Sequence, residues 1–408
     1  MKNENLVPKV RFKGFSDPWE QRKLKDVSMI GSASRVHQGD WREHGIRFLR
    51  SSDIVKMSNR EIVRNRIFIE KKLFNKLSAE TGSPKTDDVL ITGGGSIGTA
   101  YRITDDSPIY FKDADVLWIR TKNINGKFLV SYFKTNIFRK YLHSIAHIGT
   151  ISHYTIIQLK NTPIQLPAYS EQNRIGDCFV TLNSLIAANE DKLEQLKTLK
   201  KLMMQKIFSQ EWRFKGFTDP WEQRKLKNIA IRVRGNDGRM ELPTLTISAT
   251  QGWLNQKDRF SENIAGKEQK NYTLLKKGQL SYNHGNSKTA KYGAVFKLDI
   301  YTEALVPRVY HSFTVKHNNS ADFIEYLFAT GSPNRELRKL VSSGARMDGL
   351  LNISFDAFFN INLQVPIATE QMKIAKFFRK TDNLIAANED KLNQLKKLKK
   401  YLMQNMFV

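Results

Sequence analysis

Two stretches of the chain have the apolar spacing of long amphipathic helices. Steps of three, four and seven residues relate Leu182, Ile186, Asn189, Leu193, Leu196 and Met203, and similar steps relate Ile385, Asn388, Leu392, Leu395 and Leu402. This is a heptad-like pattern. A lysine-rich helix cannot bury such a stripe within itself, so we expect the two helices to pack against each other. The predicted packing residues are Ile186, Leu193, Leu196, Ile385, Leu392 and Leu395. Alternatively, each stripe packs on an α/β domain of its own.

The segments before the helices alternate short β-branched and aromatic runs with turn signals, which predicts mixed α/β structure with a twisted sheet. Each segment has an extended run leading into a glycine-rich loop, within residues 88–100 and 278–290. Each also has a glycine-containing polar turn before its final strand, at residues 148–154 and 343–349.

The chain is an internal duplication. Residues 11–25 return as residues 213–227 with fourteen of fifteen positions identical, and residues 185–208 return as 384–407 with eighteen identities in twenty-four. The stretches between these blocks, 26–160 and 228–359, match poorly. A shared frame with divergent loops is typical of recognition modules, because loops carry function on a rigid scaffold.

Charge indicates the class of partner. The 408 residues contain 66 Lys and Arg against 40 Asp and Glu, a net charge of +26. The basic residues are scattered through aromatic-rich segments and form neither a polybasic tail nor an amphipathic membrane helix, which favours nucleic acid over an anionic membrane. The N-terminal segment is polar, and no apolar run reaches the ~18 residues of a membrane span. We therefore expect a cytoplasmic protein.

The sequence offers little support for catalysis. Cys178 is the single cysteine, which excludes an intramolecular disulfide and a cysteine-based zinc site. The glycine-rich residues 93–98 belong to no Gly-x4-Gly-Lys-[Ser/Thr] phosphate loop and suit a tight turn or the close approach of a ligand equally well. The Asp-Pro-Trp runs at residues 17–19 and 219–221 lack the second proline of an amino-methyltransferase motif. We expect no catalytic residue and no metal site.

The ordered motifs resemble those of the specificity (S) subunits of type I restriction-modification enzymes. The resemblance rests on the Arg-Phe-x-Gly-Phe…Trp-Glu-x-Arg-Lys-Leu entry, the Pro-x3-Glu-Gln approach to a long helix, and the duplication of both. It covers essentially the whole chain.

This resemblance implies an α/β (α+β) fold with two target-recognition domains joined by two long helices, which form an antiparallel coiled coil in a pseudo-two-fold internal repeat. The expected ranges are 1–165 and 211–364 for the recognition domains and 166–210 and 365–408 for the helical regions. It also implies a non-catalytic subunit that reads a bipartite, asymmetric double-stranded DNA target. The expected partners are two methyltransferase (M) subunits and, optionally, two restriction/translocase (R) subunits. S-adenosylmethionine and ATP would bind to the partners and not to this chain. The alternative is a duplicated DNA-binding regulator without enzyme partners.

Candidate base-reading residues are polar side chains, most of them on or beside the glycine-rich loops and polar turns. Asn suits adenine, and Arg or Lys suits guanine. In the first domain they are Thr92, Ser96, Arg102, Thr150, Ser152, His153 and Tyr154. In the second they are Asn283, His284, Asn286, Lys288, Arg308 and Arg346. The alternative for several of them is that they only form turns.

Overall fold

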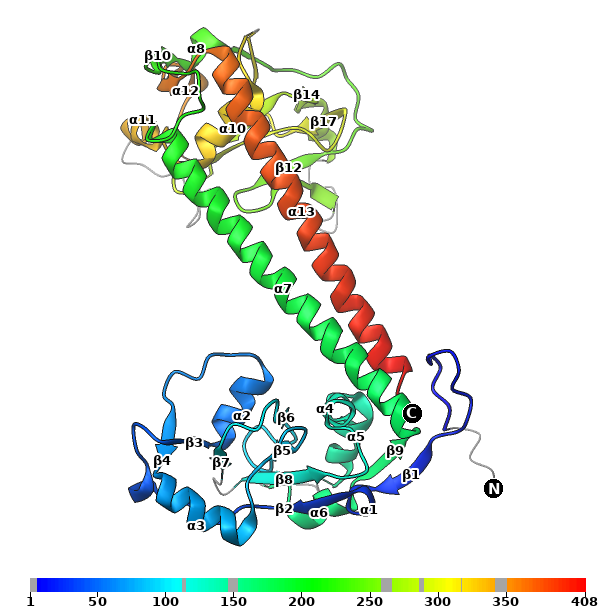
Figure 1. Ribbon diagram of the computed structural model, residues 1–408. Helices are drawn as coiled ribbons and strands as arrows, with labels where there is room; N and C mark the ends of the chain where they lie inside the picture. The colour runs from blue at the N-terminus through cyan, green and yellow to red at the C-terminus, as the bar shows by residue number, and fades with distance from the viewer. Residues whose placement is uncertain are drawn as a thin grey trace. The chain divides into compact units, whose positions relative to one another are not determined.

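The computed structural model describes residues 6–111, 115–145, 153–257, 266–285, 290–316, 318–341 and 351–408. The chain divides into two compact units. Unit 1 comprises residues 1–191 and 390–408, and unit 2 comprises residues 192–389. Two long helices, α7 (Tyr169–Phe208) and α13 (Ala368–Asn405), each begin in one unit and end in the other (Figure 1).

Unit 1 is a mixed α/β domain. Its strands are β1 (Glu20–Lys23), β2 (Ser28–Gly31), β3 (Ile46–Leu49), β4 (Ile67–Ile69), β5 (Val89–Thr92), β6 (Ala100–Arg102), β7 (Ile109–Phe111), β8 (Val116–Thr121) and β9 (Pro163–Leu166). Its helices before α7 are α1 (Leu24–Val27), η1 (Gln38–Asp40), α2 (Ser51–Ser58), α3 (Lys71–Thr81), α4 (Gly126–Phe133), α5 (Asn136–Ile145) and α6 (Ile156–Asn161).

Unit 2 is also mixed. Its strands are β10 (Glu222–Lys225), β11 (Ala230–Arg232), β12 (Leu245–Ser248), β13 (Gly252–Asn255), β14 (Thr273–Lys276), β15 (Leu280–Asn283), β16 (Ala294–Lys297), β17 (Glu303–Val306), β18 (His311–Val315) and β19 (Asn362–Val365). Its helices before α13 are α8 (Leu226–Ile229), η2 (Gly266–Asn271), α10 (Ala321–Ala329), α11 (Asn334–Leu340) and α12 (Phe355–Phe359). The predicted fold class is confirmed.

The duplication extends into segments whose sequences match poorly. In unit 1 an antiparallel sheet has the order β2-β8-β5-β6, and in unit 2 the order β11-β18-β15-β16 is its counterpart. The antiparallel ribbons β1-β9 and β10-β19 also correspond. The units differ in what is inserted. Unit 1 has the three-stranded sheet β4-β3-β7, whereas unit 2 has the ribbons β12-β13 and β14-β17.

A buried ion pair explains two of the duplicated motif residues. The Arg11 guanidinium donates through Nε and Nη2 to the Glu171 carboxylate, at 2.7 and 2.8 Å, and the Glu171 side chain is fully buried. In unit 2, Arg213 donates to Glu370 in the same bidentate manner, at 3.0 and 2.6 Å. Both glutamates lie in the first turn of a long helix, where a negative charge is favourable. Each pair therefore attaches the entry motif of a unit to the start of its helix.

The neighbouring glutamines attach the same helices to the recognition domains. Gln172 accepts a hydrogen bond from the Asn125 amide, the N-cap of α4, and donates to the Pro167 carbonyl. Gln371 accepts from the Ser320 amide, the N-cap of α10, and donates to the Pro366 carbonyl. These matching contacts make α4 and α10 structural equivalents.

An aromatic cluster closes the core of each unit. In unit 1, Phe407, two residues past the end of α13, packs on four rings, with centroid separations of 6.2 Å to Trp19, 5.5 Å to Phe128, 6.5 Å to Tyr132 and 5.8 Å to Phe179. The equivalent cluster of unit 2 places Phe208, at the end of α7, beside Trp221, Phe323 and Phe378. Each core therefore contains an aromatic side chain from the helix that starts in the other repeat.

Ion pairs join α7 to α13 inside each unit. Glu190 pairs with Lys396 at 2.6 Å in unit 1, and the equivalent Glu389 pairs with Lys197 at 2.6 Å in unit 2. In unit 2, Lys200 also pairs with Asp382, so the residue number rises along α7 as it falls along α13, and these segments are antiparallel. Of the predicted packing residues, Ile186 and Leu392 are buried, and Leu193, Leu196, Ile385 and Leu395 are half-buried.

The helices are longer than the predicted stripes. α7 has 40 residues and begins at Tyr169, well before residue 182. Its first turns bury Ile175 and Phe179 in the core of unit 1, so the apolar face there meets the domain. Asn189, inside the stripe, is buried and donates to the Leu185 carbonyl of its own helix. Each helix thus packs on a domain core as well as on the other helix.

We predict that Phe407→Ala destabilises unit 1 by about 3–5 kcal/mol, the usual cost of deleting a buried Phe ring. The matched control is Ile62→Ala, because Ile62 is in the same unit and 77% exposed. Denaturant unfolding followed by tryptophan fluorescence measures the difference. Equal stability of the two variants would contradict the closing role of Phe407.

Candidate nucleic-acid interface

The glycine-rich loop of unit 1 connects β5 to β6. Thr92, at its start, is fully buried, and its hydroxyl donates to the Ser96 carbonyl and accepts from the Thr99 amide. Ser96 and Gly95 are exposed at the tip, where Gly95 has a φ of +62°. Thr92 therefore holds the loop through these hydrogen bonds, and Ser96 is the candidate base-reading residue that the loop exposes to solvent.

The glycines of this loop allow other parts of unit 1 to approach its backbone closely. A Cβ on Gly93 would lie 2.6 Å from the Tyr154 carbonyl oxygen, and one on Gly94 would lie 2.5 Å from the Asp115 carboxylate. Gly98 has a φ of +78°, and a Cβ there would lie 2.6 Å from Leu142. The loop is therefore fixed by packing on three sides.

Asp115 brings His153 to this loop. The exposed His153 ring bonds through Nδ1 to Asp115 Oδ1 at 2.9 Å. Tyr154 is buried, its hydroxyl bonds to Thr162, and burial raises the pKa of the phenol. The half-buried Arg102 bonds to Asp87 at 3.3 Å, at the other end of β6. The structure thus brings Ser96 and His153 to the glycine-rich loop, buries Tyr154 beneath it and places Arg102 elsewhere. Thr150 and Ser152 lie outside the described residues.

In unit 2 the equivalent loop follows β15. Asn283 donates to the Ile247 carbonyl at 3.2 Å and accepts from the Gly285 amide at 3.0 Å. His284 is buried, with Nδ1 at 2.7 Å from the Leu351 carbonyl oxygen and Nε2 at 2.9 Å from that of Val309. Both side chains hold neighbouring segments together. Asn286, Lys288 and Arg346 lie outside the described residues.

Arg308 is exposed and belongs to a basic pocket of about 430 Å³. Arg232, Arg234 and Lys270 line the same pocket, with Asn236, Asn271 and Tyr310, and none of its described lining residues is acidic. Arg232 also lies 4.0 Å from the Phe355 ring centroid. Sequence reasoning missed these three cations because they come from β11, the loop after it and η2. The spacing of Arg232 and Arg234, two apart at the end of a strand, was the available signal.

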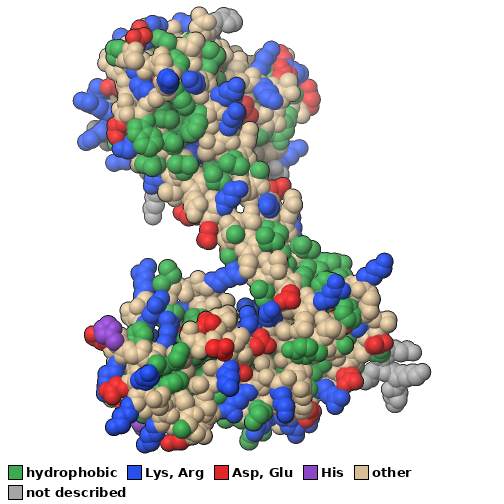
Figure 2. Space-filling model, viewed as in Figure 1, with side chains coloured by type: hydrophobic (Ala, Val, Ile, Leu, Met, Phe, Trp, Pro, Cys, Tyr) green, Lys and Arg blue, Asp and Glu red, His purple; other side chains and the backbone are tan. Residues whose placement is uncertain are grey.

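Basic side chains predominate on one face of the protein, where Lys and Arg outnumber acidic side chains (Figure 2). Within the described ranges, no three His, Cys, Asp or Glu side chains are grouped so as to hold a metal ion. No helix in the same ranges has the length and apolar character needed to span a bilayer.

Comparison with protein families decides the class. The family model for the type I restriction modification DNA specificity domain matches the chain twice, at residues 16–198 and 219–397. The chain belongs to this family. Each match contains one recognition domain and most of the long helix that follows it.

One curated relative and two solved structures are similar to this chain. A Haemophilus influenzae protein whose name describes it as a type I restriction enzyme specificity subunit is 32% identical over 124 residues, and this match covers 29% of the chain and 31% of that protein. The crystal structure of a type I restriction-modification S subunit from M. genitalium has a TM-score of 0.59 at 13% identity, over 98% of this chain and 99% of that one. It therefore has the same fold as this specificity-family chain. An HsdS subunit from Thermoanaerobacter tengcongensis gives a TM-score of 0.45 at 14% identity, over 94% and 95% of the two chains.

A histidine pair beside the second loop gives a pH prediction. His311 stacks on His284 with a centroid separation of 4.9 Å, and burial lowers the pKa of His311 from 6.5 to about 4. Between these pH values the unfolded chain takes up a proton that the folded chain does not, so unfolding becomes easier as pH falls. The contribution of the neutral His311 to the free energy of unfolding is complete above about pH 6.5 and is lost toward pH 4. Over this interval the free energy of unfolding falls by about 3 kcal/mol.

The test compares unfolding free energies of the native chain and of His311→Gln at pH 7 and pH 4.5. The variant keeps a side-chain donor for the Ile353 carbonyl but does not titrate there. We expect its stability to fall less over this interval than that of the native chain. The same fall in both proteins would contradict the prediction.

Proposed function

We propose that the chain is the DNA-specificity subunit of a type I restriction-modification complex and that it reads a bipartite, asymmetric target. The observation that carries this proposal is the matched scaffold of the two units with different insertions. Equivalent sheets present equivalent loops after β5 and β15, while the inserted strands differ. Two different readers on one repeated frame suit two different half-sites separated by unread bases.

Reading would combine phosphate contacts with a few base contacts. The net charge of +26 and the basic pocket around Arg308 supply cations for phosphates. Ser96 and His153 are exposed beside the first loop, where a hydroxyl and an imidazole can reach base edges. For Thr92, Tyr154 and His284, burial supports a role in holding the loops in place.

The long helices offer surfaces for partners. Leu185, Leu398 and Tyr401 in unit 1 are 46%, 47% and 54% exposed, and their equivalents in unit 2 are Leu384, Leu199 and Leu202, at 45%, 47% and 41%. Exposed apolar side chains at equivalent positions support two equivalent docking sites. We propose that two methyltransferase subunits bind there, and that two restriction/translocase subunits join optionally.

Catalysis belongs to those partners in this proposal. S-adenosylmethionine and ATP would bind to them, and this chain alone would neither methylate nor cut DNA. The sequence supports this, because it contains no phosphate-loop motif and no complete amino-methyltransferase motif. The complex would work on chromosomal DNA in the cytoplasm.

Exchange of one recognition domain tests the proposal. Replacing residues 26–160 with the corresponding segment of another family member should change one half-site of the methylated motif and leave the other intact. The matched exchange of residues 228–359 should change the opposite half-site. Methylation mapping of DNA from cells that carry each chimera with its methyltransferase gives the result. A change of both half-sites by a single exchange would overturn the modular reading.

A further inference from the structure

A second basic pocket lies within unit 1, between the recognition domain and the helix pair. It has a volume of about 680 Å³. Its wall includes Ile97, Gly98 and Thr99 of the glycine-rich loop, together with Asn183 and Glu190 of α7. Six cations line it: Arg60, Lys134, Arg139, Lys396, Lys399 and Lys400. Glu190 is the single acidic residue among its described lining residues, and it already pairs with Lys396.

Three of these cations, Arg60, Lys134 and Lys399, act on one another electrostatically and form no ion pair with a described carboxylate. Burial, then the nearby Lys399 and Arg60, lower the pKa of Lys134. Burial and Arg60 likewise lower the pKa of Lys399, against the opposing effect of the Glu190 carboxylate. Among the described residues, neither lysine forms an ion pair, and the Arg60 guanidinium donates to the Asn183 backbone carbonyl. Like charges held together in this way destabilise the free protein unless an anion binds between them.

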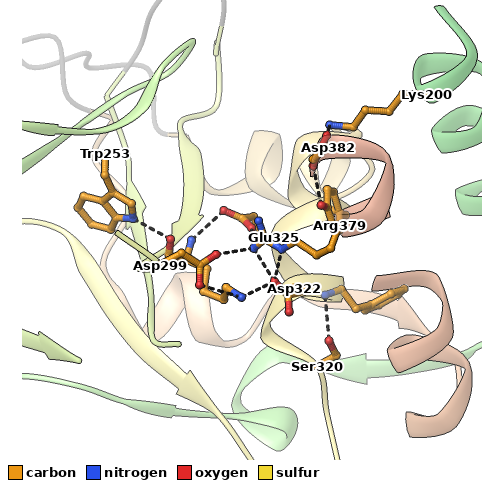
Figure 3. Close-up of polar contacts among 11 residues, drawn as sticks. Lys200, Trp253, Asp299, Ser320, Asp322, Glu325, Arg379 and Asp382 are labelled. Carbon is orange, nitrogen blue, oxygen red and sulfur yellow. Dashed lines mark hydrogen bonds and ion pairs between the residues drawn. The ribbon is translucent and has the colours of Figure 1, made fainter. Parts of the chain in front are cut away.

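The equivalent place in unit 2 is neutralised. The counterpart of Lys399 is Lys200, which pairs with Asp382 at 2.5 Å (Figure 3). Asn183 stands in unit 1 where Asp382 stands in unit 2, since both helices repeat at an offset of 199 residues. The counterpart of Lys134, counted from the equivalent N-caps of α4 and α10, is Ala329. Unit 2 therefore has the Asp382 carboxylate as a counter-ion for Lys200. At the equivalent position unit 1 has the uncharged Asn183, and it also has an additional lysine, Lys134.

We infer that the pocket formed by Arg60, Lys134 and Lys399 binds a backbone phosphate of the DNA duplex, next to the first reading loop. This inference rests on the proposed function. The ligand is a phosphate diester because these cations line a pocket whose one described carboxylate, Glu190, is already paired with Lys396, an arrangement that suits several phosphate oxygens. The position beside Ile97–Thr99 puts this contact at the loop that presents Ser96, so the phosphate would fix the register of the duplex on that loop.

The sharpest variant copies unit 2 into unit 1. Asn183→Asp supplies the carboxylate that Lys200 already has, so Lys399 acquires an internal partner. We expect the free chain to be at least as stable as the native chain, while the reconstituted complex binds target duplex about tenfold more weakly at 100 mM salt. The salt dependence of log K should fall by about one. If the Asn183→Asp chain is at least as stable as the native chain but its complex binds DNA more weakly, the weaker binding comes from loss of a ligand site and not from damage to the fold.

A second test variant and two controls accompany Asn183→Asp. Lys399→Gln should also reduce the salt slope by about one, because it removes one phosphate contact. Asn183→Ser leaves the charge unchanged and should bind within twofold of the native complex. Lys200→Gln in unit 2 should also bind within twofold, since its cation is already paired.

The outcomes are distinct. Native affinity and slope in both Asn183→Asp and Lys399→Gln, in a complex that binds DNA, would overturn the phosphate site and leave the proposed function standing. Failure of the native complex to bind duplex DNA would overturn the proposed function. Impaired assembly of Asn183→Asp with the methyltransferase, with unchanged DNA affinity of the assembled fraction, would assign the pocket to an acidic protein group and overturn the inference.

Discussion

Closure of each domain core by the end of a helix that starts in the other repeat is the constraint on which the rest of the structure depends. Phe407 completes the cluster of Trp19, Phe128 and Phe179, and Phe208 completes its equivalent. At the other end of each helix, a buried Arg–Glu pair attaches the start of α7 or α13 to the entry motif. A buried carboxylate that loses its partner costs several kcal/mol, so both ends of each helix are fixed. Neither repeat has a complete core of its own.

This arrangement explains which parts of the sequence repeat closely and which do not. The near-identical blocks hold the residues that join helix to domain: Arg11 and Trp19 in one block, Phe208 in the other, and their counterparts. The inserted strands β3, β4 and β7 in unit 1, and β12, β13, β14 and β17 in unit 2, take no part in these junctions. Their sequences are free to differ, which is what two readers with different targets require.

The duplication, the mixed α/β class and the two long helices could be predicted from sequence, because repeated motifs and heptad spacing are local signals. The apolar spacing by itself indicates only the part of α7 from residue 182 onward, because Ile175 and Phe179 pack on the domain and not along the heptad stripe. Among the candidate readers, Thr92 and His284 sit in loops that look exposed in sequence, yet both are buried and hold the backbone. Pattern alone does not show which way a loop side chain points. The cations Arg232, Arg234 and Lys270 gather only when β11 and η2 meet in three dimensions. Likewise, the three-dimensional structure is needed to show that Lys200 has an acidic partner in Asp382 whereas Lys399 forms no ion pair with a described residue.

Methylation mapping of DNA modified by the native chain with its methyltransferase subunits tests the central claim most directly. The mapping should be repeated with the methyltransferase alone and with the chain alone. The account predicts one motif of two different short half-sites at a fixed spacing, methylated only when both proteins are present. A methylated motif produced by the chain alone, or the same motif produced by the methyltransferase without this chain, would contradict it.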